Sequence, residues 1–211
     1  MSGSVVTVDS VRAVEIEPTP IDGLLLIRPK PFVDERGFFV RTMTADVFGA
    51  AGIDCAAFVQ ANQSRSSGGV LRGIHLRSHD GEAKTVRCAR GTIFDVAVDC
   101  RPSSPTFGQW WGCELSDENH LQLYFPHGVG HGFYAVSDVV DVCYQHTEFY
   151  DPAKEIGIFW NDPAVGIAWP LHRGPAGADG AEGVIEAPSL SARDGIAPTL
   201  AELRADLAQW F

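Results

Sequence analysis

Thr92-Ile93-Phe94-Asp95-Val96-Ala97-Val98-Asp99 is the most informative run of this chain. It reads with a period of two residues and consists mainly of β-branched and aromatic side chains, which is the pattern of a β-strand. Ten further runs of this kind are expected at residues 23–27, 37–42, 55–62, 70–76, 84–89, 108–114, 120–125, 130–135, 139–146 and 157–160. Short strands separated by glycine and proline turns predict a β-sandwich or barrel.

Helix is expected in only two places, at residues 44–51 and at the C-terminus. Thr199-Leu200-Ala201-Glu202 has the form of a capping box, and apolar residues follow it at helical spacing as far as Trp210. A glycine- and alanine-rich stretch between residues 171 and 188 predicts a flexible loop. We therefore expect one all-β domain over residues 1–211, with its core at about residues 21–170 and a C-terminal segment and helix at 171–211.

The composition excludes several classes of protein. A chain of 211 residues that is 45% hydrophobic has enough apolar side chains for one sizeable core. Its net charge of −11 excludes an overall basic surface built for nucleic acid. There is no apolar run of membrane-spanning length and no signal-peptide pattern at the start. Five widely spaced cysteines without a CxxC motif indicate free thiols, so we expect a cytoplasmic protein without a membrane partner.

Residues 65–90 reverse the sign of the chain's overall charge. This segment holds six basic residues and only two acidic ones: Arg65, Arg72, Arg77, Lys84, Arg87 and Arg90 against Asp80 and Glu82. A concave site lined with such groups would bind phosphate, because arginine offers a bidentate fork and lysine a point charge. The alternative is a solvated sheet face, and composition alone does not choose between the two.

His75 lies in the middle of this basic segment, within a predicted strand. The period of two places His75 and Arg77 on one face of the strand and Arg72 on the other. A single histidine in a strand is more often structural than catalytic. The surrounding positive charges make His75 a candidate acid or base.

Two further patterns match the cupin motifs. Pro126-His127-Gly128-Val129-Gly130-His131 has the form PxGxxH, and Gly69, His75 and Glu82 fit G(x)5HxH(x)4E. Arg77 stands at the second histidine of that motif, and an arginine never deprotonates to bind a metal. The sequence therefore predicts a cupin-like barrel without a metal site and without a cofactor.

Seven stretches closely resemble the dTDP-4-dehydrorhamnose 3,5-epimerase family, and the resemblance runs in order from about Ile21 to Asp194. They are DERGFF at 34–39, VLRGIH at 70–75, FDVAVD at 94–99, SPTFG at 104–108, HGF at 131–133, WNDP at 160–163 and LSARD at 190–194. The resemblance implies a cupin-like jelly roll that forms a homodimer. It also implies a nucleotide-sugar substrate, a nucleotide-linked 4-keto-6-deoxy-hexose that is epimerised at C3 and C5.

Epimerisation next to a ketone needs a base, an opposed acid and a cation near the enolate oxygen. By resemblance, His75 is the base and Asp194 is its dyad carboxylate. Tyr144 occupies the position of the acid, and Lys84 that of the group that stabilises the enolate.

The resemblance also implies a set of substrate-binding residues. Arg72 corresponds to a diphosphate contact, and Arg36 to an arginine that reaches the neighbouring subunit's site. The remaining positions of this set are Gln60, Asn62, His131 and Arg77, with Asp95 as a further polar residue of the barrel interior.

The sequence departs from the family pattern at three positions. Arg77 stands where a glutamine is common, Arg41 where a glutamate often contacts the base, and Phe149 where a tyrosine is common. These departures leave open a C3-only or C5-only epimerase of an antibiotic or surface-glycan sugar. A metal-dependent cupin enzyme and a non-catalytic sugar-nucleotide binding module are the rivals from other classes.

Overall fold

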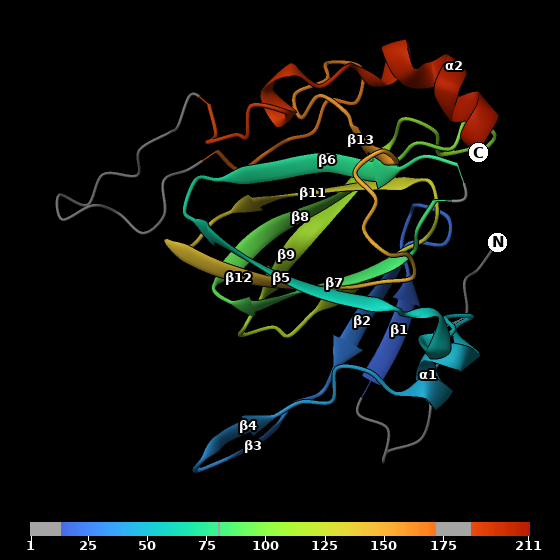
Figure 1. The fold of residues 1–211 in the computed structure, drawn as a ribbon. Helices are drawn as coiled ribbons and strands as arrows, with labels where there is room; N and C mark the ends of the chain where they lie inside the picture. Colours follow the sequence, from blue (N-terminus) through green and yellow to red (C-terminus); the bar gives the residue numbers. More distant parts are fainter. Residues whose placement is uncertain (1–13, 80, 172–186) are drawn as a thin grey trace, which may run out of the picture.

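The computed structural model describes residues 14–79, 81–171 and 187–211. Two antiparallel sheets dominate it and face each other (Figure 1). The six-stranded sheet has the order β1 (Val14–Pro18), β2 (Leu25–Pro29), β10 (Gln122–Phe125), β7 (Lys84–Arg90), β12 (Val139–His146) and β5 (Gln60–Ser67). The five-stranded sheet has the order β13 (Glu155–Gly157), β6 (Leu71–Arg77), β11 (Val129–Ala135), β8 (Thr92–Asp99) and β9 (Trp110–Ser116). The expected all-β jelly-roll architecture is confirmed.

The remaining elements are short and lie outside the two sheets. Strands β3 (Phe32–Asp34) and β4 (Gly37–Phe39) form a hairpin that projects from the body (Figure 1). Helix α1 (Ala45–Ala50) lies beside β1, and α2 (Leu200–Trp210) covers the outer side of the five-stranded sheet. Two 3-10 turns occur at Cys55–Ala57 and Asp194–Ile196. Neither α-helix of the described segments is long and apolar enough to cross a membrane.

The C-terminal helix begins where its capping box predicts. The Thr199 hydroxyl accepts a hydrogen bond from the Glu202 backbone amide, and the Glu202 carboxylate accepts one from the Thr199 amide at 2.7 Å. Leu207, fully buried, packs with Ile74 of β6 and Val98 of β8 beneath the helix. The helix is therefore an integral part of the fold that holds the outer side of β6.

The prediction of a strand over residues 55–62 was wrong in its first half. The Asp54 carboxylate accepts a hydrogen bond from the Ala56 amide at 2.9 Å and starts a 3-10 turn instead. The strand begins only at Gln60 and continues to Ser67. Its residues are polar or small, without the alternation of apolar and polar side chains that marks most strands. Strands β1 and β3 were also missed, and the run at 157–160 forms a strand at Glu155–Gly157 instead. Most of the predicted loop at 171–188 lies outside the described residues, and the division at residue 170 stays a prediction.

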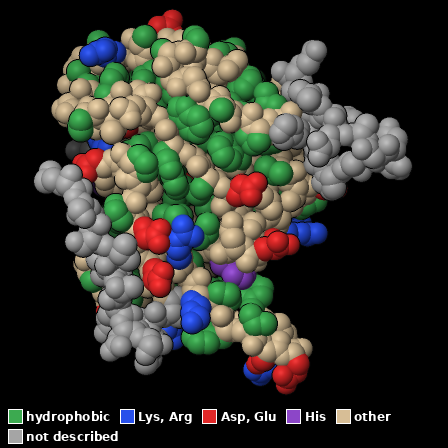
Figure 2. Space-filling view, turned by 180° about the vertical axis from the view of Figure 1, so that it is seen from behind, with side chains coloured by type: hydrophobic (Ala, Val, Ile, Leu, Met, Phe, Trp, Pro, Cys, Tyr) green, Lys and Arg blue, Asp and Glu red, His purple; other side chains and the backbone are tan. Residues whose placement is uncertain are grey.

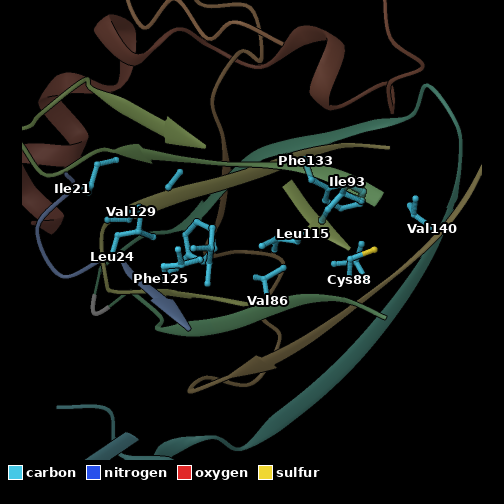
Figure 3. Packing of buried hydrophobic residues seen from close by; sticks show 14 of the residues in the cluster. Ile21, Leu24, Val86, Cys88, Ile93, Leu115, Phe125, Val129, Phe133 and Val140 are labelled. Carbon is cyan, nitrogen blue, oxygen red and sulfur yellow. The ribbon is translucent and has the colours of Figure 1, made fainter. Parts of the chain in front are cut away.

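The space between the sheets is apolar at one end and polar at the other. Leu115, Val86 and Phe133 belong to the apolar cluster, which Figure 3 shows between the two layers. Phe125 lies at the edge of this cluster, with its ring centroid 4.6 Å from that of His131 and 5.9 Å from the Lys84 ammonium. Beyond Phe125 the interior becomes a polar cavity.

Candidate active site

A cavity of about 420 Å³ opens at the polar end of the barrel. Both sheets contribute to its walls. Seven of the ten predicted site residues line it: Asn62, Arg72, His75, Arg77, Lys84, His131 and Tyr144. A second hollow shares Arg72, His75 and Arg193 with the first, so His75 lies where the two spaces meet.

Strand β6 places Arg72 and His75 on the same cavity, which corrects the alternation predicted from the sequence. His75 pairs with His131 of β11, whereas Arg72 pairs with Phe133, so three steps on β6 match two on β11. The extra residue lies near Gly73, which has a φ of 124°. A Cβ at Gly73 would lie 2.5 Å from the Gly132 Cα, so only glycine fits this irregularity.

His75 and Asp194 form the predicted dyad. The His75 Nε2 lies 2.7 Å from the Asp194 Oδ1, although the two residues are far apart in the chain. Asp194 starts a 3-10 turn and its amide donates to the Ser191 hydroxyl at 3.1 Å. Burial acts to raise the pKa of Asp194, but the hydrogen bond and charge of His75 outweigh it and hold that pKa below its usual value. Asp194 is therefore a buried carboxylate that orients the ring.

Arg193 is a site residue that sequence reasoning missed. Its Nη2 lies 3.0 Å from the His75 Nε2, and its Nη1 forms an ion pair with Glu155 at 2.6 Å. One ring nitrogen cannot donate to Asp194 and accept from Arg193 at once, and the ionised, closer Asp194 is the stronger partner. Neither contact uses Nδ1. The sequence did contain a signal for Arg193, because this residue directly precedes Asp194 in the stretch LSARD that resembles the family.

Tyr144 and Lys84 lie on the opposite sheet from His75. The Tyr144 Oη is 3.3 Å from the Ser64 hydroxyl of the neighbouring strand β5. Burial raises the pKa of Tyr144 above its usual value, so the phenol keeps its proton at neutral pH. Lys84 is almost fully buried, with its ammonium 3.6 Å from a Glu82 oxygen. The cavity thus has a histidine on one wall and a proton donor and a cation on the facing wall.

His131 and Asp95 form a second, buried pair. The His131 Nε2 lies 2.8 Å from the Asp95 Oδ2. Burial lowers the pKa of His131 and raises that of Asp95, in each case against the effect of the partner. The other Asp95 oxygen, Oδ1, has no hydrogen-bond partner among the described residues. The ring of His131 therefore lines the cavity, and its hydrogen bond to Asp95 fixes the position of the ring.

Arg77 lines the cavity, but other protein groups engage its guanidinium. Its Nε lies 3.0 Å from the Glu82 Oε2, and its Nη1 donates to the Phe149 carbonyl. Glu82 in turn lies 3.1 Å from the His146 Nδ1. No three histidine, cysteine or carboxylate side chains within the described ranges are placed to hold a metal ion. The glutamate of the cupin motif is thus bound to protein cations.

Three predicted residues do not line the cavity, and one of them, Asp194, lines the adjoining second hollow instead. Gln60 lies beside it, where its side-chain amide donates to Asn62 Oδ1 at 3.2 Å and its oxygen accepts from the Tyr150 amide at 2.9 Å. Arg36 is at the tip of the β3–β4 hairpin, with 83% of its side chain exposed and an ion pair with Asp34. The structure therefore does not bring Arg36 to the cavity of its own chain.

Comparison with known proteins gives one consistent result. The family model described as dTDP-4-dehydrorhamnose 3,5-epimerase matches residues 18–202. A dTDP-4-dehydrorhamnose 3,5-epimerase of Salmonella typhimurium is 44% identical over 183 residues, which are 86% of this chain and 93% of that protein. A dTDP-4-dehydrorhamnose 3-epimerase of Streptomyces niveus is 40% identical over 192 residues, covering 90% of this chain and 86% of the relative.

A solved structure extends this likeness to three dimensions. It is a dTDP-6-deoxy-D-glucose-3,5-epimerase from Legionella pneumophila in complex with dTDP-4-keto-L-rhamnose. The two chains superpose with a TM-score of 0.81 at 42% identity, over 92% of this chain and 96% of the other.

Proposed function

This chain belongs to the dTDP-4-dehydrorhamnose 3,5-epimerase family, and we propose that His75, Asp194, Lys84 and Tyr144 perform its reaction. The protein is an epimerase of a nucleotide-linked 4-keto-6-deoxy sugar. The observation that carries the proposed roles is the placement of His75 on one sheet and of Tyr144 and Lys84 on the facing sheet of one cavity. A carbon between these walls can lose a proton to one face and gain one from the other.

The chemistry follows from this placement. His75 takes the proton from the carbon next to the ketone, and the electron pair of the broken C–H bond moves to the ketone oxygen, which becomes an enolate. The Lys84 ammonium, in a water-poor site, stabilises that negative charge. Tyr144 then gives its proton to the opposite face of the same carbon. Asp194 keeps the His75 ring oriented and stabilises its protonated form.

Substrate binding is proposed to use the polar rim of the cavity. Arg72 is exposed on β6, and its Nε donates to the Ser66 hydroxyl at 2.9 Å. This bond fixes the side chain while the rest of the guanidinium stays available to a diphosphate. The rim also holds Asn62, with Gln60 beside it, for the sugar or the base.

The decisive experiment is incubation with dTDP-4-keto-6-deoxy-glucose in deuterated water, followed by NMR at C3 and C5. We expect deuterium and inversion at both carbons. Exchange at C3 alone would support the second candidate, a monoepimerase, which the 3-epimerase relative from Streptomyces niveus and the departures at Arg41 and Phe149 favour. Binding without any exchange would instead indicate a non-catalytic module.

Metal removal is expected to leave the activity intact. At the second histidine of the cupin motif this chain has Arg77, which neutralises Glu82 at 3.0 Å instead of binding a metal. Purified protein should contain no stoichiometric transition metal and should keep full turnover in EDTA. Loss of turnover in EDTA that added metal restores would contradict a metal-free reaction and support the rival cupin enzyme.

The protein is proposed to act as a homodimer through the β3–β4 hairpin. Val33 and Phe39 of the hairpin are 75% and 66% exposed, and Figure 2 shows the hairpin standing away from the body with apolar side chains along it. Such side chains indicate a protein partner. A second copy would cover them and receive Arg36 near its cavity, as the family resemblance implies.

Sedimentation at assay concentration should therefore show a dimer. Phe39→Asp places a charge in the proposed interface, so this variant should sediment as a monomer and lose turnover, because each cavity then lacks the partner's hairpin. Val59→Asp is the matched control, since Val59 is an exposed apolar residue outside the hairpin. A monomeric wild-type protein with full activity would refute the dimer.

The five free cysteines support a reducing, cytoplasmic location, which stays a prediction.

A further inference from the structure

We propose that Glu82 is a positioning residue for Lys84: its buried carboxylate, oriented by Arg77 and His146, keeps the Lys84 side chain charged and in place at the cavity wall. The inference deepens the proposed function and rests on the role given there to Lys84. It concerns a group of four side chains, Arg77, Glu82, Lys84 and His146, that we call the Glu82 network.

The geometry divides the two oxygens of Glu82 between different partners. Oε2 lies 3.0 Å from the Arg77 Nε and 3.1 Å from the His146 Nδ1. Oε1 is the oxygen nearest Lys84, at 3.6 Å from its ammonium. Because Arg77 and His146 hold one oxygen, the carboxylate cannot rotate freely and the other oxygen stays directed at Lys84.

The network is buried and joins three strands. The side chains of Arg77, Glu82 and Lys84 are each 7% exposed and that of His146 is 11% exposed. Arg77 ends β6, Lys84 begins β7, and His146 ends β12, where it pairs directly with Lys84. Glu82 therefore connects the two facing sheets at the end of the barrel where the cavity opens.

Charge explains why Lys84 needs this partner. Burial lowers the pKa of Lys84, and the charge of Glu82 is the largest effect that opposes it. Burial also acts to raise the pKa of Glu82, but the hydrogen bond from His146 and the charges of Lys84 and Arg77 outweigh it and lower that pKa to about 2. Glu82 is thus an anion throughout the neutral range, whereas an unpaired buried ammonium tends to lose its proton.

Other ionisable groups surround Lys84 but do not replace Glu82. Asp95 on β8 is a second carboxylate whose charge acts on Lys84, yet it is paired with His131 on β11. Arg77 acts in the opposite direction and lowers the pKa of Lys84. The other ionisable groups that line the cavity are Arg72 and His75 on β6, Tyr144 on β12, and Tyr150, Glu155 and Arg193, of which Glu155 forms an ion pair with Arg193. Glu82 is the carboxylate in ion-pair contact with Lys84, and its charge acts on the pKa of Lys84 more strongly than that of Asp95.

The chain allows the state of Lys84 to be measured directly. Lys30, Lys84 and Lys154 are its three lysines, so protein labelled with ¹³C-lysine gives few signals, and Lys30→Arg and Lys154→Arg assign them. The pH titration of the Lys84 signal is recorded alongside the pH dependence of kcat and KM. A group that only stabilises the fold would change the melting temperature without moving this titration.

Glu82→Gln is expected to move the titration of Lys84 to lower pH by about 1 pH unit or more, because an opposite charge in contact is lost. The alkaline limb of the pH profile of kcat should move to lower pH together with the titration of Lys84, while KM should change little. Arg77→Gln should move both in the opposite direction, because it removes a cation that lowers the pKa of Lys84 while His146 still holds the Glu82 carboxylate. This variant keeps the test open if Glu82→Gln does not fold. Glu82→Asp, which keeps the charge, should restore most of the wild-type titration.

Glu17→Gln is the matched control, because Glu17 also pairs with an arginine, at 3.1 Å, on the edge strand β1. It should leave the Lys84 titration unchanged. An unchanged Lys84 titration in Glu82→Gln or in Arg77→Gln would overturn the inference. A shifted titration with an unshifted kcat limb would support the inference about Glu82 and contradict the proposed catalytic role of Lys84.

Discussion

His75→Ala is expected to lose about 100-fold to 10,000-fold in turnover and to lose solvent deuterium exchange as well. No carbanion forms without a base, so both the inversion and the exchange that precedes it must stop. The ring sits where the two hollows of the site meet, and its Nε2 is held at 2.7 Å by Asp194. Alanine removes this ring and leaves Asp194 without its partner.

The measurement is NMR of the substrate in deuterated water, with exchange and inversion followed separately. Asp194→Asn should behave like His75→Ala and lose exchange and inversion together, since Asp194 orients the His75 ring and stabilises its protonated form. His79→Asn is the matched control: His79 lies just beyond β6 with a φ of 61°, a conformation that asparagine tolerates. A His75→Ala protein that still exchanges deuterium at the wild-type rate would mean that another group is the base.

Tyr144→Phe is expected to keep measurable deuterium exchange while net inversion falls by about 100-fold to 10,000-fold. The enolate still forms beside Lys84, but in the absence of the phenol it receives its proton from the face it left. The substitution removes little else. Phenylalanine keeps the ring that stacks at 5.8 Å on His146 and loses only the 3.3 Å contact with Ser64.

The contrast between exchange and inversion is the readout for this variant. Tyr124→Phe removes a half-buried phenol on β10, which β7 separates from β12 in the same sheet; it lies outside the cavity, so the substitution should change neither rate. If Tyr144→Phe and His75→Ala lose exchange to the same extent, the roles of acid and base are misassigned. In that case the proton donor must be sought among the other groups of the six-stranded sheet that line the cavity, with His146 of β12 first.

Local patterns predicted those elements whose side chains alternate between a core and the opposite face. The strands at Thr92–Asp99 and Val139–His146 were predicted to the residue, because each has β-branched residues buried at regular intervals. The capping box at Thr199 likewise predicted the start of α2. Most of strand β5 was missed because its eight residues are polar or small, and only its pairing with β12 makes it a strand.

The candidate site was likewise predicted from the sequence only in part. The motifs identified the residue types and their positions, including the arginine that takes the place of a metal ligand in the cupin motif. The dyad itself joins His75 to Asp194 over 119 positions, and no local pattern encodes that distance. The resemblance supplied the pairing, and the structure supplied its geometry and the unexpected neighbour Arg193.

The sequence alone was sufficient for the all-β class, the terminal helix and the residues with the right chemistry, because a period of two and a capping box depend on neighbours a few positions apart. Only the tertiary structure showed that Arg72 shares a face with His75, since a bulge opposite Gly132 shifts the register of β6. It alone showed that Glu82 faces Lys84, Arg77 and His146 at once. Such contacts depend on which strands pair and at what register, and both are decided by packing between residues far apart in the chain.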